Sequence, residues 1–159
     1  MQDMLVKLYE LPPDAALAVP SEEGIQIRRA MAPDFFRITD FVRSLSGPSA
    51  AGECTVCFQG YPITCFLATR GSKILGYACY NATAPDFFGP TAVLPEERGK
   101  GIGRALLLRA LAALRDQGYG YAIIGGVGPK TFYEHCVGAA SIPGSDPGIY
   151  KDFLAIQAD

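Results

Sequence analysis

The chain has 159 residues, of which 49% are hydrophobic and 19% charged, and its formal net charge is -2. This length and composition predict one globular domain over residues 1–159 and exclude a disordered chain. The slightly negative charge argues against nucleic acid as an obligate partner, because binding phosphates requires a basic surface.

The apolar stretches are too short to cross a membrane, and Lys and Arg interrupt them. The first residues also lack the basic segment followed by a long apolar one that marks an export signal. We therefore expect a cytoplasmic protein with no membrane partner.

The chain has five cysteines, which is an odd number, and the compartment we expect for it is reducing. A disulfide framework is therefore not expected. Cys54 and Cys57 form one CxxC pair, but a tetrahedral zinc site needs four ligands. The single histidine, His135, is far away in the sequence. We expect the cysteines to be small core residues with free thiols, and we expect no metal site.

Hydrophobic periodicity predicts two short strands and a helix in the first third of the chain. Apolar residues alternate over residues 5–9 and 25–28, as in strands. Pro33 and Asp34 begin a helix that carries apolar side chains at helical spacing up to Leu45. The polar stretch that follows has room for another short helix.

The middle of the chain is rich in strands. Residues 64–69 and 74–81 are predicted to form a hairpin, and residues 87–94 a third strand that Pro95 ends. The strongest helix is predicted over residues 102–117, because its apolar side chains recur on one face.

A buried strand, a short helix and a last strand follow this helix. They are predicted over Tyr121–Ile124, residues 129–136 and residues 149–154. The resulting order is strand, helix, strand pair, strand, helix, strand, helix, strand. It predicts an α/β fold with a mixed sheet flanked by helices.

The chemistry concentrates where the 87–94 strand passes through a glycine-rich turn into the next helix. A helix N-terminus offers unpaired N–H groups and the positive end of the helix dipole to an anion. Gly99, Gly101 and Gly103 carry no side chain that would block a diphosphate. Arg98, Lys100 and Arg104 are the cations of this segment, which predicts a phosphate-binding loop.

Two other phosphate loops fit the sequence less well. A dinucleotide-binding turn needs the spacing GxGxxG, whereas this segment reads GxGxG. The segment GGVGPKT at residues 125–131 resembles a P-loop, but Ile124 and Pro129 stand where that motif needs glycines.

The segment VLPEERGKGIGRALL, residues 93–107, resembles the acetyl-CoA-binding motif of the GNAT N-acetyltransferase superfamily. Phe132-Tyr133-Glu134 is similar to the FYE segment of that family, and the expected element order matches as well. The resemblance covers the chain from about Ile25 onward. It implies a GNAT-like fold with a splayed mixed sheet and acetyl-CoA as co-substrate.

The resemblance also implies a cofactor site. Val93 and Leu94 would offer backbone groups to the pantetheine arm, and the loop backbone would hold the pyrophosphate. The residues implied for the loop are Arg98, Gly99, Lys100, Gly101, Ile102, Gly103 and Arg104.

Acetyl transfer to an amine needs alignment, removal of a proton from the amine and protonation of the leaving thiolate. Tyr133 matches the position of the family's acid, although a packed aromatic side chain is the alternative reading. Asp86 and Glu53 are the candidates for the base, although the sequence favours a solvated surface charge as the reading of each. His135 would point away from the face of Tyr133 and is expected to have a structural or surface role.

These features favour an acetyl-CoA-dependent N-acetyltransferase that acts on a primary amine of a small molecule or a peptide. The alternative is a non-catalytic module of the same fold that binds or senses acyl-CoA. The acceptor, the acyl preference and the oligomeric state stay open, and a homodimer is allowed.

Overall fold

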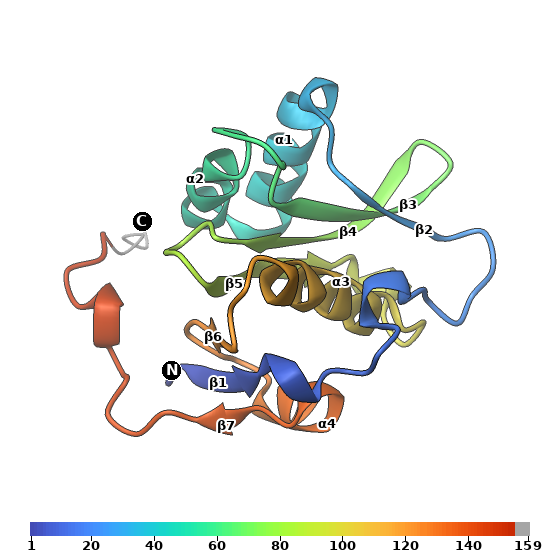
Figure 1. The fold of residues 1–159 in the computed structure, drawn as a ribbon. Coiled ribbons are helices and arrows are strands. Elements are labelled where there is room, and N and C mark those ends of the chain that lie inside the picture. Colours follow the sequence, from blue (N-terminus) through green and yellow to red (C-terminus); the bar gives the residue numbers. More distant parts are fainter. Residues whose placement is uncertain (155–159) are drawn as a thin grey trace.

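The computed structural model describes residues 1–154, which fold around a mixed seven-stranded sheet with the strand order β2-β3-β4-β5-β6-β1-β7 (Figure 1). All neighbouring strands are antiparallel except β5 and β6, which are parallel. The strands are β1 (Met4–Lys7), β2 (Gln26–Arg29), β3 (Cys65–Arg70), β4 (Lys73–Tyr80), β5 (Phe87–Val93), β6 (Tyr121–Ile124) and β7 (Ala140–Ser141).

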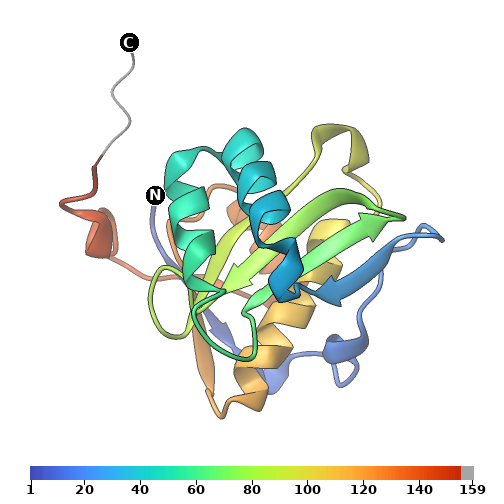
Figure 2. The same ribbon diagram turned by 90° about the horizontal axis from the view of Figure 1, so that it is seen from above.

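Helices cover both faces of the sheet. The helices are α1 (Phe35–Ser46), α2 (Pro48–Val56), α3 (Ile102–Asp116) and α4 (Lys130–Val137). Helices α1 and α2 lie side by side over one face, as Figures 1 and 2 show, and α3 packs against β3, β4 and β5 on the other. Side chains alternate along the strands, so each face has its own apolar core.

The parallel pair β5 and β6 separates soon after it begins. Their ladder contains only the pairs Phe87 with Ile123 and Phe88 with Ile124. Strand β5 continues to Val93, whereas β6 ends at Ile124 and the chain turns at Gly125 and Gly126. The backbone of β5 beyond Phe88 therefore has no strand partner on its β6 side.

The N-terminal strand closes the far edge of β6. Strand β1 is antiparallel to β6, with Met4 opposite Ile124, and its other edge pairs with β7. The residues that precede β1 consequently lie beside the loop that follows β6.

The α/β fold with a mixed sheet flanked by helices is confirmed. The helix at residues 102–117 and the strands at 64–69, 74–81 and 87–94 each occur within one residue of their predicted bounds. The short helix expected in the polar stretch is α2. Cys54 and Cys57 at its end are buried, as expected.

The predicted final strand over residues 149–154 is wrong. Residues Gly148–Tyr150 form a short 3-10 turn, and the last strand of the sheet is Ala140–Ser141 instead. Gly148 has a φ of +55°, a left-handed conformation that interrupts an extended chain. Strand β1 already occupies the edge of β6 that a final strand would have used.

No helix within residues 1–154 is both long and apolar enough to span a membrane.

Candidate functional site

The glycine-rich turn places an open helix N-terminus beside the end of β5. Gly99 and Gly101 have φ values of +81° and +80°, which a side chain would strain. The first helical bond runs from the Ala105 N–H to the Gly101 carbonyl, 3.1 Å, and no side chain caps the helix. The N–H groups of the first turn of α3 are therefore open to an anion.

The segment between β1 and β2 forms hydrogen bonds with this turn. Both the N–H and the hydroxyl of Ser21 donate to the Lys100 carbonyl, at 3.1 and 2.9 Å. A Cβ at Gly101 would make ordinary contacts with Ser21, the nearest at 3.4 Å. The position therefore favours glycine through its backbone conformation.

The three cations of the turn do not act alike. Lys100 Nζ lies 2.7 Å from the Glu97 carboxylate and 3.6 Å from that of Glu22, so its charge is already paired. Arg98 and Arg104 are exposed and form no ion pair with any residue in the range 1–154. The side chains of Arg98 and Arg104 are therefore available to an anion, whereas that of Lys100 is already engaged.

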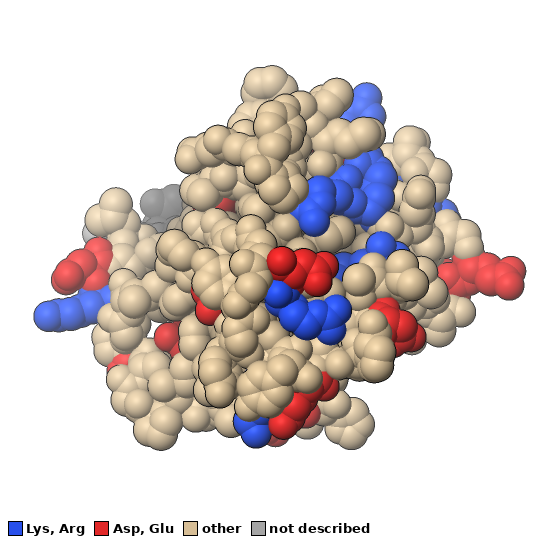
Figure 3. All heavy atoms as spheres, in the orientation of Figure 1, with Lys and Arg blue, Asp and Glu red and all other residues tan. Residues whose placement is uncertain are grey.

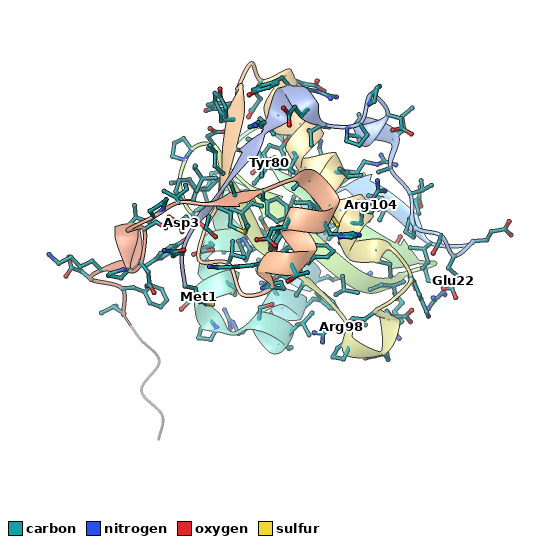
Figure 4. All side chains as sticks on the ribbon, turned by 90° about the horizontal axis from the view of Figure 1, so that it is seen from below. Met1, Asp3, Glu22, Tyr80, Arg98 and Arg104 are labelled. Atoms are coloured by element: carbon teal, nitrogen blue, oxygen red, sulfur yellow. The ribbon has the colours of Figure 1, made fainter. Side chains whose placement is uncertain are left out.

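Figure 4 shows where these two arginines lie: Arg98 is on the turn before α3, and Arg104 is beside α4. The wider surface has no uniform charge. On the face shown in Figure 3, basic and acidic side chains are interspersed.

The end of β5 offers one free backbone edge. The Leu94 N–H donates to the Leu75 carbonyl at 2.9 Å, so this donor is used within the sheet. Val93 stands opposite Gly76, and the alternation of an antiparallel ladder turns its N–H and C=O toward the gap beside β6. Of the two residues expected to serve a pantetheine arm, Val93 has its amide free to do so.

A cavity of about 470 Å³ occupies the place where β5 and β6 diverge. Side chains from β4, β5, α2 and α4 and the C-terminal segment line it. They include Glu53, Tyr77, Thr91, Tyr133 and Tyr150.

Tyr133 lies in the wall of this cavity and is 6% exposed. Its ring packs edge-on against Phe88 and Phe132, with centroids 6.2 and 5.1 Å apart. Burial raises the pKa of Tyr133 to about 12, so the hydroxyl keeps its proton at neutral pH. Its side chain makes no hydrogen bond within the described chain.

The cavity and the glycine-rich turn adjoin each other. A Cβ at Gly103 would lie 3.6 Å from the ring of Phe132 and 3.8 Å from the side chain of Val93. The first turn of α3, the end of β5 and helix α4 therefore meet at one point. A ligand held at the turn could extend along β5 toward Tyr133.

The structure separates the two candidate bases. Glu53, on α2, lines the cavity and accepts a hydrogen bond from the Thr83 hydroxyl at 3.1 Å. Burial raises the pKa of Glu53, an effect that the Thr83 bond opposes.

Asp86 does not line the cavity. It precedes β5 with a φ of +66°, and its N–H donates to the Asn81 side chain at 2.7 Å. One carboxylate oxygen, Oδ1, is buried without a partner, and burial raises the pKa of Asp86 to about 6. The geometry therefore favours Glu53 over Asp86 as a group that faces a substrate.

Two residues of this region have no signal in the sequence. The Asp3 carboxylate accepts a hydrogen bond from the Gly126 N–H at 2.8 Å and so holds the loop after β6. Tyr150 packs over the same loop, since a Cβ at Gly125 would collide with its hydroxyl. Both lie far from the motifs along the chain, and only the fold brings them there. His135 is exposed on α4, in line with its expected surface role.

A family model described as an acetyltransferase (GNAT) domain matches residues 62–136. No curated protein matches the chain. Among solved structures, the glucosamine N-acetyltransferase region of a fungal multi-domain GH3 β-N-acetylglucosaminidase has a TM-score of 0.70 at 16% identity. That match covers 89% of this chain and 19% of the other.

Two further structures are similar. A GCN5-related N-acetyltransferase from Sphaerobacter thermophilus has a TM-score of 0.66 at 21% identity, over 89% of this chain and 48% of that chain. The acetyltransferase YhbS from Escherichia coli, solved with CoA, has a TM-score of 0.50 at 20% identity, over 64% and 62%. The chain thus spans less than half of the first two proteins, and these likenesses show a shared fold.

Proposed function

We propose that the chain is a GNAT acetyltransferase, since a model of that domain matches residues 62–136 and the fold is shared with GNAT proteins. In this proposal it transfers the acetyl group of acetyl-CoA to a primary amine of a small molecule or a peptide. One observation carries this proposal: the cavity between β5 and β6 holds a protonated Tyr133 and a half-buried Glu53, and it adjoins an open helix N-terminus. An anion site, a proton donor and a proton acceptor therefore lie along one path.

The acyl donor would lie along β5. The open N–H groups of α3 and the unpaired side chains of Arg98 and Arg104 suit the diphosphate of CoA. The free backbone edge at Val93 suits the amide groups of the pantetheine arm. This arrangement would direct the thioester toward Tyr133.

The chemistry is a direct transfer. The amine nitrogen attacks the thioester carbonyl, a C–N bond forms, and the C–S bond breaks to release the CoA thiolate. Tyr133 would give its proton to that thiolate, and Glu53 would take the proton that the amine loses. The raised pKa values of both groups support these roles, because a Tyr must stay protonated to donate and a carboxylate with a raised pKa is a stronger base.

The acceptor would be an amine with an apolar portion. Aromatic side chains form part of the cavity wall, Tyr77, Phe88 and Tyr150 among them, and Glu53 supplies a negative charge. An ammonium group is attracted to that carboxylate before it loses its proton. A volume of about 470 Å³ suits a small molecule or the end of a peptide.

A thiol-release assay tests the proposal. The full chain would be mixed with acetyl-CoA and a panel of polyamines, amino acids, aminoglycosides and peptides with free N-termini. We expect amine-dependent release of CoA and an acetylated product in the mass spectrum. Tight binding of acetyl-CoA without release for any amine would favour the non-catalytic acyl-CoA-binding module. Failure to bind acetyl-CoA would contradict both readings.

A further inference from the structure

Four of the five cysteines converge in the core between α2 and the sheet. Cys54 and Cys57 come from the end of α2, Cys65 from β3 and Cys79 from β4. All four are at most 2% exposed and belong to the apolar core that α1 and α2 cover. This cluster lies apart from the glycine-rich turn, and acetyl transfer as described above does not use it.

The thiols are close enough to share a ligand. The sulfur atoms of Cys54, Cys65 and Cys79 all lie within 4.8 Å of one another. Cys65 and Cys79 stand directly opposite each other on β3 and β4. Cys57 caps the C-terminus of α2, three residues after Cys54, and is buried in the same apolar core.

The distances fit a metal centre. Zinc–sulfur bonds are about 2.3 Å long, so the sulfurs of a tetrahedral site are about 3.8 Å apart. The sulfurs of Cys54, Cys65 and Cys79 need only a small contraction to reach that spacing, and Cys57 would supply the fourth ligand. The ligands also come in two pairs, a CxxC at a helix end and a cross-strand pair on a hairpin, and the CxxC spacing is common in structural zinc sites.

Packing alone explains this convergence poorly. Cysteine does behave as a small apolar residue in cores, and alanine or valine would fill the same space. Helix α2 and strands β3 and β4 nevertheless each place a cysteine at this point of the core. The remaining cysteine, Cys136 on α4, lies outside the cluster.

We propose that Cys54, Cys57, Cys65 and Cys79 bind one Zn²⁺ ion as thiolates and so fasten helix α2 to strands β3 and β4. This revises the sequence-based expectation of no metal, which considered only Cys54, Cys57 and His135. Glu53 is the neighbour of Cys54 on α2, so the ion fixes the wall of the cavity that carries Glu53.

Metal analysis of the wild-type chain is the first test. Chain purified without chelators from zinc-supplemented cells should contain about one Zn²⁺ per molecule, released when a mercurial reagent blocks the thiols. Reduced apoprotein titrated with Co²⁺ should show the intense visible absorption of tetrahedral cobalt thiolate. Adding Zn²⁺ should abolish that absorption and raise the melting temperature of the apoprotein.

Variants locate the site. Cys57→Ser replaces the ligand at the end of α2 and should lower the zinc affinity at least tenfold, as judged by competition with a chromogenic chelator. Cys136→Ser is the matched control and should keep the zinc content of the wild type. If a cluster variant fails to fold, the cobalt spectrum of the wild type still decides the question.

Three results would overturn the proposal. The first is reduced wild-type apoprotein whose cobalt spectrum is that of the hydrated ion and whose melting temperature does not respond to Zn²⁺. The second is a disulfide within the cluster, seen by mass spectrometry after alkylation of the unreduced chain. The third is a folded double variant, Cys54→Ser with Cys57→Ser, that contains as much zinc as the wild type. None of these readouts depends on acetyl transfer.

Discussion

Arg70 and Glu97 form a two-pronged ion pair beside the glycine-rich turn, with Nη1–Oε1 and Nη2–Oε2 distances of 2.7 and 3.0 Å. The Glu97 side chain is 6% exposed and also accepts from Lys100 at 2.7 Å. This carboxylate therefore ties the end of β3 to the turn. It also neutralises the charge of Lys100.

Replacing Glu97 with Gln should destabilise the fold at neutral pH, by a few degrees in melting temperature. Arg70, and then Lys100, lower the pKa of Glu97 to about 2 from an ordinary value of 4.5. Its stabilising effect is therefore complete above about pH 4.5 and is lost as the pH falls toward 2. Thermal melts of wild type and Glu97→Gln over this range should converge at low pH.

Glu96→Gln serves as the control, since Glu96 is the exposed neighbour of Glu97 and forms no ion pair within residues 1–154. Its melting temperature should follow that of the wild type at every pH. Parallel curves for Glu97→Gln and wild type down to low pH would show that the ion pair contributes nothing.

The unequal roles of the three cations predict unequal effects on CoA binding. Arg98→Ala and Arg104→Ala should each weaken acetyl-CoA affinity by about three- to tenfold, since each removes one exposed charge near the diphosphate. Lys100→Met should change the affinity by less than about twofold, because Glu97 already neutralises this charge. Calorimetric titrations of the three variants measure these constants.

A stronger effect of Lys100→Met than of either arginine variant would contradict this assignment.

The glycines of the loop offer a separate check, beginning with Gly103. A Cβ there would make ordinary contacts with Phe132 and Val93, so Gly103→Ala should fold normally. Gly101→Ala, in contrast, would be strained at a φ of +80°.

Asp86 should limit stability at neutral pH. Burial raises its pKa to about 6 in the fold from an ordinary value of 3.8, so ionisation is disfavoured in the folded chain. Stability contributed by the protonated form is present below about pH 3.8 and is lost as the pH rises through 6. Asp86→Asn should therefore stabilise the chain at about pH 8, by about 1 kcal/mol after allowance for solvent screening.

Chemical denaturation at two pH values measures this effect. Asparagine tolerates the positive φ at this position, so the substitution adds no backbone strain. At about pH 3 the two proteins should be equally stable, because both side chains are then neutral. A variant that is less stable than the wild type at about pH 8 would show that ionised Asp86 has a favourable partner in solution.

Local patterns predicted most of the helices and strands, because each carries its own periodicity and end signals. The glycine-rich turn could also be predicted from the sequence. The positive φ values at Gly99 and Gly101 favour glycine at both positions. The ion pair between Glu97 and Lys100, in contrast, was not predicted from the sequence and is seen only in the structure.

Contacts between segments that are distant in the sequence could not be predicted from local patterns. The apolar residues near Ile149 resemble a strand, yet β1 from the other end of the chain takes the place beside β6. Cys65 and Cys79 join Cys54 only because the hairpin lies under α2. The choice of Glu53 over Asp86 likewise depends on which side chain faces the cavity.

Glu53 should control the low-pH side of the activity profile. If it accepts the proton of the amine, activity falls as the pH drops through its pKa, because the protonated carboxyl cannot act as a base. Burial raises that pKa, so the decline should begin at a higher pH than for an exposed Glu. Glu53→Gln should lower kcat by about a hundredfold and abolish this limb. An unchanged limb in that variant would assign the proton to water or to another group.

Thr83→Val offers a graded test of the same group. The Thr83 hydroxyl donates to Glu53, and this bond lowers the pKa of the carboxyl against the effect of burial. Removing the donor should therefore move the low-pH limb to higher pH while kcat at its plateau changes little. A shift toward lower pH would show that the limb belongs to a different residue.

Tyr133→Phe tests proton donation apart from the fold. The ring packs edge-on against Phe88 and Phe132, and phenylalanine keeps this packing while it loses the hydroxyl. Because burial raises the pKa of Tyr133 to about 12, the wild type should retain its donor throughout the usual assay range. General acid catalysis contributes about a hundredfold or more, so we expect kcat to fall by about that factor while acetyl-CoA affinity stays nearly constant. Steady-state kinetics with the acceptor found in the amine panel, together with calorimetry, separate the two effects. A kcat within about threefold of the wild type would mean that water or the substrate protonates the thiolate.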